Sequence, residues 1–136
     1  MIVGIGTDII EVDRIRKACS KQAFLMRCFT ENELKYINEN YERAASNFAV
    51  KESVAKSFGT GFRGFELLDI EVLRDELGKP YVNLYGEADN IAKKLNIDFI
   101  HVSISNIKEY AIAYVVAESR WFYDTFIFIF GDEKSR

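Results

Sequence analysis

The chain has 136 residues, a formal net charge of −3 and a hydrophobic content of 49%, which is the size and composition of one folded domain. Its charged content of 29%, single proline and lack of biased tracts exclude an intrinsically disordered protein. The 18 basic side chains do not outnumber the 21 acidic ones, so we expect no general binding to nucleic acid.

Residues 2 to 10 are β-branched and rich in glycine, which predicts a buried strand. Gly4, Gly6 and Asp8 share one face of it by the period-two rule. Glycines on one face indicate that another backbone or a ligand approaches closely, and tight packing of a helix is the favoured interpretation. Because Asp8 interrupts this apolar segment and no basic leader precedes it, we expect neither a signal peptide nor membrane contact.

Residues 11 to 28 have a helical pattern, and the segment TENE at 30 to 33 matches a capping box that starts another helix. Thr30 would accept a hydrogen bond from the first turn, while Glu33 would reach back. Cys19 and Cys28 show no repeated spacing, which favours neither a zinc site nor a disulfide framework. We therefore expect a cytoplasmic protein.

The longest predicted helix covers residues 41 to 58 and ends at Gly59. Glu52 and Lys56 project from one face of it, and the common interpretation of such a pair is a surface ion pair. The alternative is a metal site, because the buried carboxylate of Asp8 needs a partner or a cation. A single histidine, His101, excludes sites built from several imidazoles and leaves oxygen ligands, which suit magnesium or calcium.

The remaining pattern predicts an antiparallel α+β domain. Residues 67 to 85 give a hairpin around 76 to 78, followed by a short helix near 87 to 95. Residues 97 to 106 alternate between an apolar and a polar face, and residues 110 to 118 form a continuous apolar strand suited to the middle of the sheet. The apolar tail at 121 to 130 is too short to span a bilayer. It could form either a subunit contact or an extra edge strand, and the sequence favours neither interpretation.

A basic run lies at residues 14 to 27, in a chain that is acidic overall. Arg14, Lys17 and Lys21 share one face of the predicted helix. A solvated face is the ordinary explanation, and a surface for an acidic partner is the alternative.

Five segments occur in the order found in the bacterial holo-acyl-carrier-protein synthases: GIGTDIIEVDRI, FTENEL, FAVKESVAKSFGTG, GKPYV and HVSISNIKEYAIA. The chain resembles this phosphopantetheinyl transferase family over residues 1 to about 118, which leaves 119–136 as an apolar extension of unknown role. The resemblance implies an α+β fold and Mg²⁺-dependent transfer of phosphopantetheine from coenzyme A to a serine of apo acyl carrier protein. The serine hydroxyl would attack in line and release adenosine 3′,5′-bisphosphate, in support of fatty acid biosynthesis.

The resemblance also implies roles for individual residues. Asp8 and Glu52 match the family's magnesium ligands, and Lys56 matches the lysine near the coenzyme A phosphates. The coenzyme A cleft would be lined by Gly59, Thr60, Gly61, Lys79, Pro80, His101, Ser103 and Asn106. Acyl carrier protein, which is acidic, would bind the first helix through Arg14, Lys17, Lys21 and Arg27. The family forms trimers with the cleft between neighbouring subunits, so we expect a homotrimer.

Asn106 departs from the family pattern, because many relatives carry histidine or an acidic residue at this position. Asparagine does not exchange a proton near neutral pH. Deprotonation of the serine would then fall to a metal-bound water or a nearby carboxylate. The alternative function is a non-catalytic module that binds coenzyme A or a carrier protein.

Overall fold

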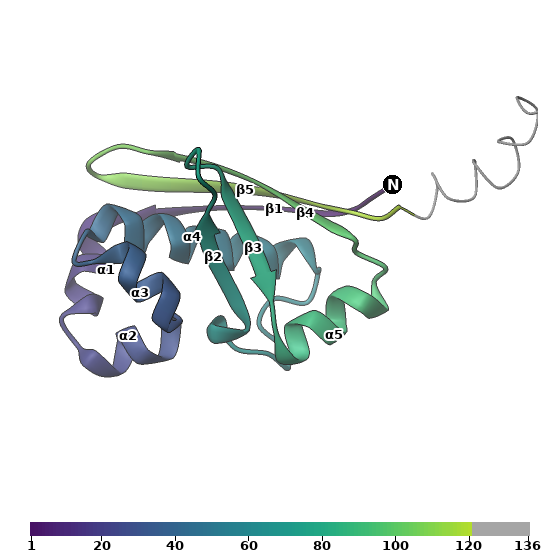
Figure 1. The fold of residues 1–136 in the computed structure, drawn as a ribbon, viewed down its shortest axis with the longest axis horizontal. Helices are drawn as coiled ribbons and strands as arrows, with labels where there is room; N and C mark the ends of the chain where they lie inside the picture. Colours follow the sequence, from purple (N-terminus) through teal and green to yellow (C-terminus); the bar gives the residue numbers. More distant parts are fainter. Residues whose placement is uncertain (121–136) are drawn as a thin grey trace, which may run out of the picture.

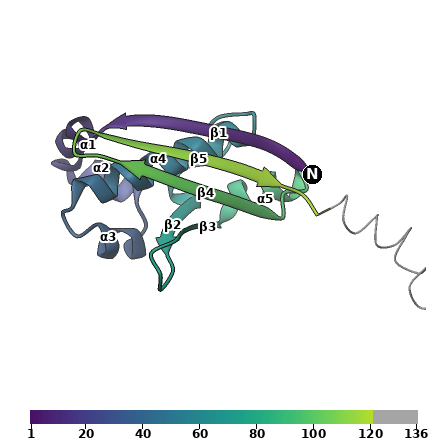
Figure 2. The same ribbon diagram turned by 90° about the horizontal axis from the view of Figure 1, so that it is seen from above.

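The computed structural model describes residues 1–120, and the apolar tail considered above lies outside them. A three-stranded antiparallel sheet has the order β1-β5-β4 and forms one layer of the molecule, and the helices and a β-hairpin lie on one side of it (Figure 1). The strands are β1 (Ile2–Glu11), β4 (Phe99–Asn106) and β5 (Tyr110–Glu118). β5 lies between β1 and β4 (Figure 2), which confirms the predicted central strand and the α+β class.

The predicted hairpin forms a separate two-stranded sheet of β2 (Ile70–Arg74) and β3 (Pro80–Leu84). The Asp75 backbone N–H donates to the Lys79 carbonyl over 2.9 Å, which closes the turn. Gly78 in this turn has a φ of 85°, a value that favours glycine. A 3-10 turn, η1 (Leu67–Asp69), precedes the hairpin, and α5 (Gly86–Lys94) follows it as predicted.

The helix predicted over residues 11 to 28 is in fact two helices, α1 (Val12–Cys19) and α2 (Gln22–Cys28). The break falls at Ser20, whose hydroxyl donates to the Lys17 carbonyl over 2.7 Å and so offers the backbone an alternative to helix continuation. Lys21 then has an extended backbone, with φ −98° and ψ 120°. The expectation that Lys21 shares a helical face with Arg14 and Lys17 is therefore wrong.

The capping box is confirmed at the start of α3 (Glu31–Ile37). The Thr30 side chain accepts from the Glu33 backbone N–H over 3.3 Å, and Glu33 accepts in return from the Thr30 backbone N–H over 3.1 Å. The next helix, α4 (Tyr41–Ser57), begins at the N-cap Asn40, whose side chain accepts from the Arg43 backbone N–H.

The long helix α4 lies directly beneath the sheet and belongs to both hydrophobic cores (Figure 1). Its C-terminal half packs with β2, α5 and the inner faces of β4 and β5, and its N-terminal half packs with α1, α2 and α3. A Cβ atom added to Gly4 would lie 1.9 Å from the Ser57 carbonyl oxygen, and one added to Gly6 would lie 1.8 Å from that of Ser53. The bare face of β1 is thus explained by the close approach of α4, as the glycine pattern predicted.

The opposite face of the sheet is uncovered within residues 1–120. Five apolar or aromatic side chains on it are exposed by 42% to 61%, namely Ile5, Ile9, Tyr110, Ile112 and Tyr114. An apolar patch of this kind is typical of a surface that contacts another molecule. In the described part of the chain no helix is long and apolar enough to cross a membrane.

Candidate active site

Asp8 continues the glycine face of β1 and lies beside the C-terminal half of α4. The Lys56 ammonium donates to an Asp8 carboxylate oxygen over 3.1 Å and to the Thr7 carbonyl over 2.9 Å. Lys56 therefore pairs with the strand and not with Glu52, so the predicted surface ion pair within the helix does not form. The Asp8 side chain is 17% exposed and that of Lys56 is 53% exposed, which leaves the ammonium accessible to an anion.

Glu52 lies one turn of α4 before Lys56 and close to Asp8. Partial burial, followed by the negative charge of Asp8, raises the pKa of the Glu52 carboxyl, and the charge of Lys56 opposes this effect. The Glu52 carboxylate has no hydrogen-bond donor among residues 1–120. Two neighbouring carboxylates, one of them without a donor, form a site that a cation would stabilise.

Asp8 and Glu52 both line a pocket of about 590 Å³ between β1, α1 and α4. Two carboxylates suit Mg²⁺, which binds through one or two of them and retains positions for water and phosphate oxygens. Within the described residues no three His, Cys, Asp or Glu side chains gather around a metal site, so the donor set is open and not a closed protein cage. The residues present therefore fit a magnesium ion that keeps positions for ligands from outside the protein.

The apolar end of this pocket leads to the basic surface of α1 and α2. Ala18 and Phe24 line both the carboxylate pocket and a neighbouring hollow of about 520 Å³. Lys17, Lys21 and Arg27 line that hollow, while Arg14 lines the carboxylate pocket itself. The four basic residues predicted to bind a partner are thus brought onto one continuous surface despite the break at Ser20.

A second group of predicted residues lies elsewhere. Pro80, Ser103 and Asn106 line a pocket of about 460 Å³ between the hairpin, α4 and the end of β4, which contains neither Asp8 nor Glu52. Sequence reasoning missed Arg43 and Arg74 in this pocket, both of which stack on the Tyr36 ring with the guanidinium carbon 4.9 Å and 4.7 Å from its centre. No local sequence motif predicts this pair, because Arg43 lies in α4 and Arg74 in β2, far apart in the sequence.

Four further predicted residues lie in the loop after α4 and in the hairpin turn, and all of them but the half-buried Gly61 are exposed. Gly59 and Gly61 follow α4 with φ angles of 77° and 62°, and Thr60 lies between them near Lys56 in the chain. Lys79 lies in the exposed turn of the hairpin. Backbone N–H groups of a glycine-rich loop can bind an anion, and the role of these four residues in a coenzyme A cleft stays a prediction.

His101 lies apart from the carboxylates. Its ring nitrogen is 3.1 Å from a Glu118 carboxylate oxygen, and its side chain is 58% exposed. In the sheet His101 is opposite Val116, which in turn is opposite Ile5 on the outer face. His101 therefore shares the face of the sheet that points away from α4, Asp8 and Glu52.

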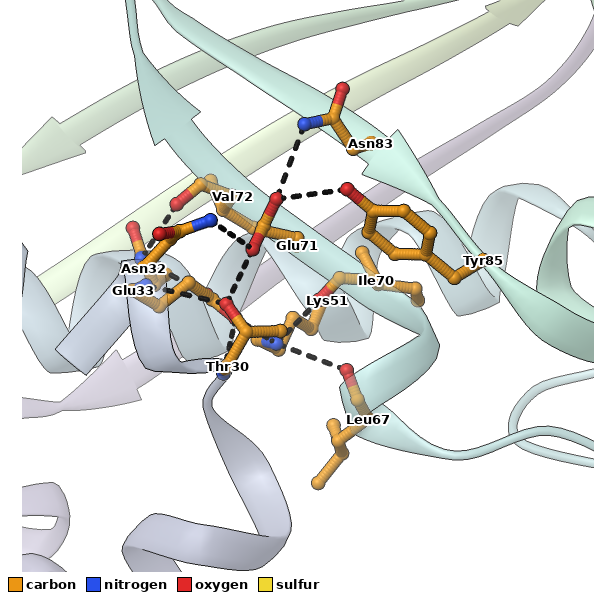
Figure 3. Close-up of polar contacts among 11 residues, drawn as sticks. Thr30, Asn32, Glu33, Lys51, Leu67, Ile70, Glu71, Val72, Asn83 and Tyr85 are labelled. Carbon is orange, nitrogen blue, oxygen red and sulfur yellow. Dashed lines mark hydrogen bonds and ion pairs between the residues drawn. The ribbon is translucent and has the colours of Figure 1, made fainter.

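The interior also contains a buried ion pair that the sequence analysis did not predict. Lys51 and Glu33 are fully buried, with 2.7 Å between the ammonium nitrogen and a carboxylate oxygen (Figure 3). Burial raises the pKa of Glu33 and lowers that of Lys51, and the charge of each partner opposes the effect. The only available signal was a lysine among small apolar residues in α4.

Comparisons with known proteins agree with this fold. A family model described as the 4′-phosphopantetheinyl transferase superfamily matches residues 4–115. A relative from Lachnoclostridium phytofermentans, named holo-[acyl-carrier-protein] synthase, is 58% identical over 118 residues, which cover 87% of this chain and 97% of the relative.

Two solved structures of proteins with the same name are similar to this fold. The one from Neisseria meningitidis has a TM-score of 0.81 at 34% identity, covering 88% of this chain and 100% of the other. The one from Bacillus anthracis, in complex with CoA (3′,5′-ADP), has a TM-score of 0.74 at 40% identity, covering 88% of this chain and 98% of the other.

The chain therefore belongs to the 4′-phosphopantetheinyl transferase superfamily. Within it, this chain is similar over most of its length to proteins named holo-[acyl-carrier-protein] synthase.

Proposed function

We propose that the protein is a holo-acyl-carrier-protein synthase that moves phosphopantetheine from coenzyme A to a serine of apo acyl carrier protein in the cytoplasm, for fatty acid biosynthesis. The observation that carries the proposal is the meeting of Asp8, Glu52 and Lys56 beside one pocket in a chain of this family. Residues 1–118 form the transferase domain, and 119–136 are an extension of unknown role.

The residues act mainly by positioning and charge, as is usual for phosphoryl transfer. Asp8 and Glu52 would hold Mg²⁺, which when bound polarises the diphosphate and offsets charge that develops on its oxygens. Lys56 would leave Asp8 for the diphosphate, or bind both, and stabilise the departing adenosine 3′,5′-bisphosphate. Asn106 has no proton to exchange near neutral pH, so the serine proton would pass to water or to a nearby carboxylate.

The carrier protein would dock on α1 and α2. The basic residues there surround an apolar hollow that runs into the carboxylate pocket. An acidic carrier bound on this surface would bring its serine toward Asp8 and Glu52, and the opposite charges would speed the encounter.

Homotrimer formation would unite the two halves of the site. The uncovered apolar face of β1 and β5 supports a subunit contact. The cleft residues Pro80, Ser103 and Asn106 are separated from Asp8 and Glu52 within one chain. A neighbouring subunit that brings its hairpin pocket to the carboxylates would complete a coenzyme A site between subunits.

The decisive experiment incubates the protein with apo acyl carrier protein, coenzyme A and Mg²⁺ and weighs the carrier by mass spectrometry. A mass gain of one phosphopantetheine arm is expected. Asp8→Ala and Glu52→Gln should abolish the transfer in folded protein, and full activity in either variant would refute the metal assignment. Coenzyme A binding without any transfer by the wild-type protein would instead show a non-catalytic binding module.

A further inference from the structure

The helix α4 that carries Glu52 and Lys56 is held from two sides. On one side, Gly6 of β1 lies so close to the Ser53 carbonyl that no side chain fits between them. On the other side, the fully buried Lys51 side chain points toward Glu33 and Leu67 (Figure 3). The two contacts involve the residues immediately before and after Glu52, so the orientation of Glu52 depends on both.

Lys51 uses every proton of its ammonium group in this interior. It donates to Glu33 of α3 over 2.7 Å, to the Leu67 carbonyl of η1 over 3.0 Å and to the Ile70 carbonyl of β2. The Lys51 side chain is fully buried, so water does not compete for these bonds. Three directed bonds to three separate elements fix the side chain, and with it the rotation and height of α4.

Glu33 is held as firmly as Lys51. One of its carboxylate oxygens also accepts from the Thr30 backbone N–H, and the other accepts from the Asn47 amide over 3.1 Å. The Asn47 amide donates in addition to the Val72 carbonyl over 3.0 Å. Thr30 in turn donates to Glu71 of β2 over 2.6 Å. The ion pair is therefore built into α3, α4 and β2 and has little freedom to shift.

Stability alone does not account for such a pair. Replacing a buried ion pair by apolar side chains of similar volume is often neutral or stabilising, because burying two charges is expensive. Apolar side chains, however, form no directed hydrogen bonds and so do not fix the rotation of a helix about its axis. A helix with side chains has a radius of about 5–6 Å, so a rotation of about 10° moves a side-chain end by about 1 Å, and an error of about 1 Å in a catalytic group reduces turnover by about 100-fold.

We propose that Lys51 and Glu33 are positioning residues, which hold α4 at the rotation that presents Glu52 and Lys56 to Asp8. The expected effect on turnover rests on the proposed function. The expected effect on the position of α4 does not depend on it. Neither residue touches the substrate, and both act through the placement of their neighbours on α4.

The test replaces both charges at nearly constant volume in the full-length chain, as Lys51→Met/Glu33→Gln. A milder variant, Glu33→Gln, keeps an acceptor for the Thr30 N–H and guards against failure of the double variant to fold. Ala88→Gly serves as the control for a loss of stability alone, because Ala88 is buried in α5, lines none of the three pockets described above and makes no side-chain hydrogen bond to α4. Denaturant unfolding shows that each protein is folded and how much stability it has lost.

Four measurements follow on the folded proteins. Both network variants should lower kcat and weaken Mn²⁺ binding in the presence of coenzyme A, measured by electron paramagnetic resonance, by about 10- to 100-fold. The KM for carrier protein should stay constant, because α1 and α2 are untouched. In a crystal structure, the Lys56 to Asp8 contact of 3.1 Å should be lost. The control should change none of the four.

Wild-type Mn²⁺ affinity, kcat and Lys56 to Asp8 distance in a folded network variant would overturn the inference and leave the pair a structural element. If the wild-type chain neither transfers phosphopantetheine nor binds Mn²⁺, the proposed function fails. In that case the crystal structure of the variant still decides the positioning: a displaced α4 supports it, and an unmoved α4 refutes it.

Discussion

The close contact between β1 and α4 makes Gly6→Ala the sharpest single perturbation of the site. The added Cβ would lie 1.8 Å from the Ser53 carbonyl oxygen, against 3.4 Å for ordinary van der Waals contact, so strand and helix must separate by about 1.6 Å. Both clashing groups are attached to backbone, so a side-chain rotation gives no relief. We expect a loss of about 3 kcal/mol in the free energy of unfolding.

The same separation should carry Glu52 and Lys56 away from Asp8. A displacement of this size predicts phosphopantetheine transfer at least about 100-fold slower at a temperature where the variant is folded, measured by mass spectrometry of the carrier. Gly64→Ala is the matched control: its φ of 88° makes alanine strained, but no atom lies within 4 Å of the added Cβ. It should lose about 1–2 kcal/mol and keep its activity. Wild-type unfolding and turnover in Gly6→Ala would refute the contact between β1 and α4.

Three other variants test separate parts of the structure. Charge reversal at Arg14 and Lys21 should raise the KM for carrier protein and leave the KM for coenzyme A unchanged. A carrier KM equal to that of the wild type would refute the proposed docking surface. Ile112→Asp should dissociate the proposed homotrimer into smaller species in sedimentation, and a variant that sediments as the wild type does would refute a subunit contact through the outer face of the sheet. Burial acts to raise the pKa of Glu71, but hydrogen bonds from Thr30, Asn83, Tyr85 and Asn32 lower it overall. The ionised Glu71 carboxylate therefore stabilises the fold at a pH above its unfolded-state pKa of about 4.5, and this stabilisation is lost as the pH falls below that value. In urea unfolding, the free energy of unfolding should fall less on acidification for Glu71→Gln than for the wild type.

The sequence predicted what depends on local patterns. The period-two glycines of β1 predicted a close approach that the Ser53 and Ser57 carbonyls confirm. The Thr30 capping box, the hairpin turn and the central apolar strand also depend on neighbouring residues, and all three were located correctly. The break at Ser20 was missed because a single serine in a helical pattern is compatible with either outcome.

What the sequence did not predict depends on residues that meet only in the folded chain. Lys51 and Glu33 are 18 positions apart, and no local rule pairs a lysine in one helix with the capping residue of another. Arg43 and Arg74 share the Tyr36 ring for the same non-local reason. For Asp8, Glu52 and Lys56 the resemblance to a family supplied the association that spacing alone did not.

The double use of Glu33, in the capping box of α3 and in the bond to Lys51, couples the folding of two helices. A helix of seven residues is far too short to persist alone in water. The capping box of α3 buries the Glu33 carboxylate, and this burial is favourable only when α4 packs against α3 and the Lys51 ammonium neutralises the charge. We therefore expect α3 to lack an independent local opening, so that its amide protons exchange with solvent at the rate of the α4 amides, in one cooperative unit.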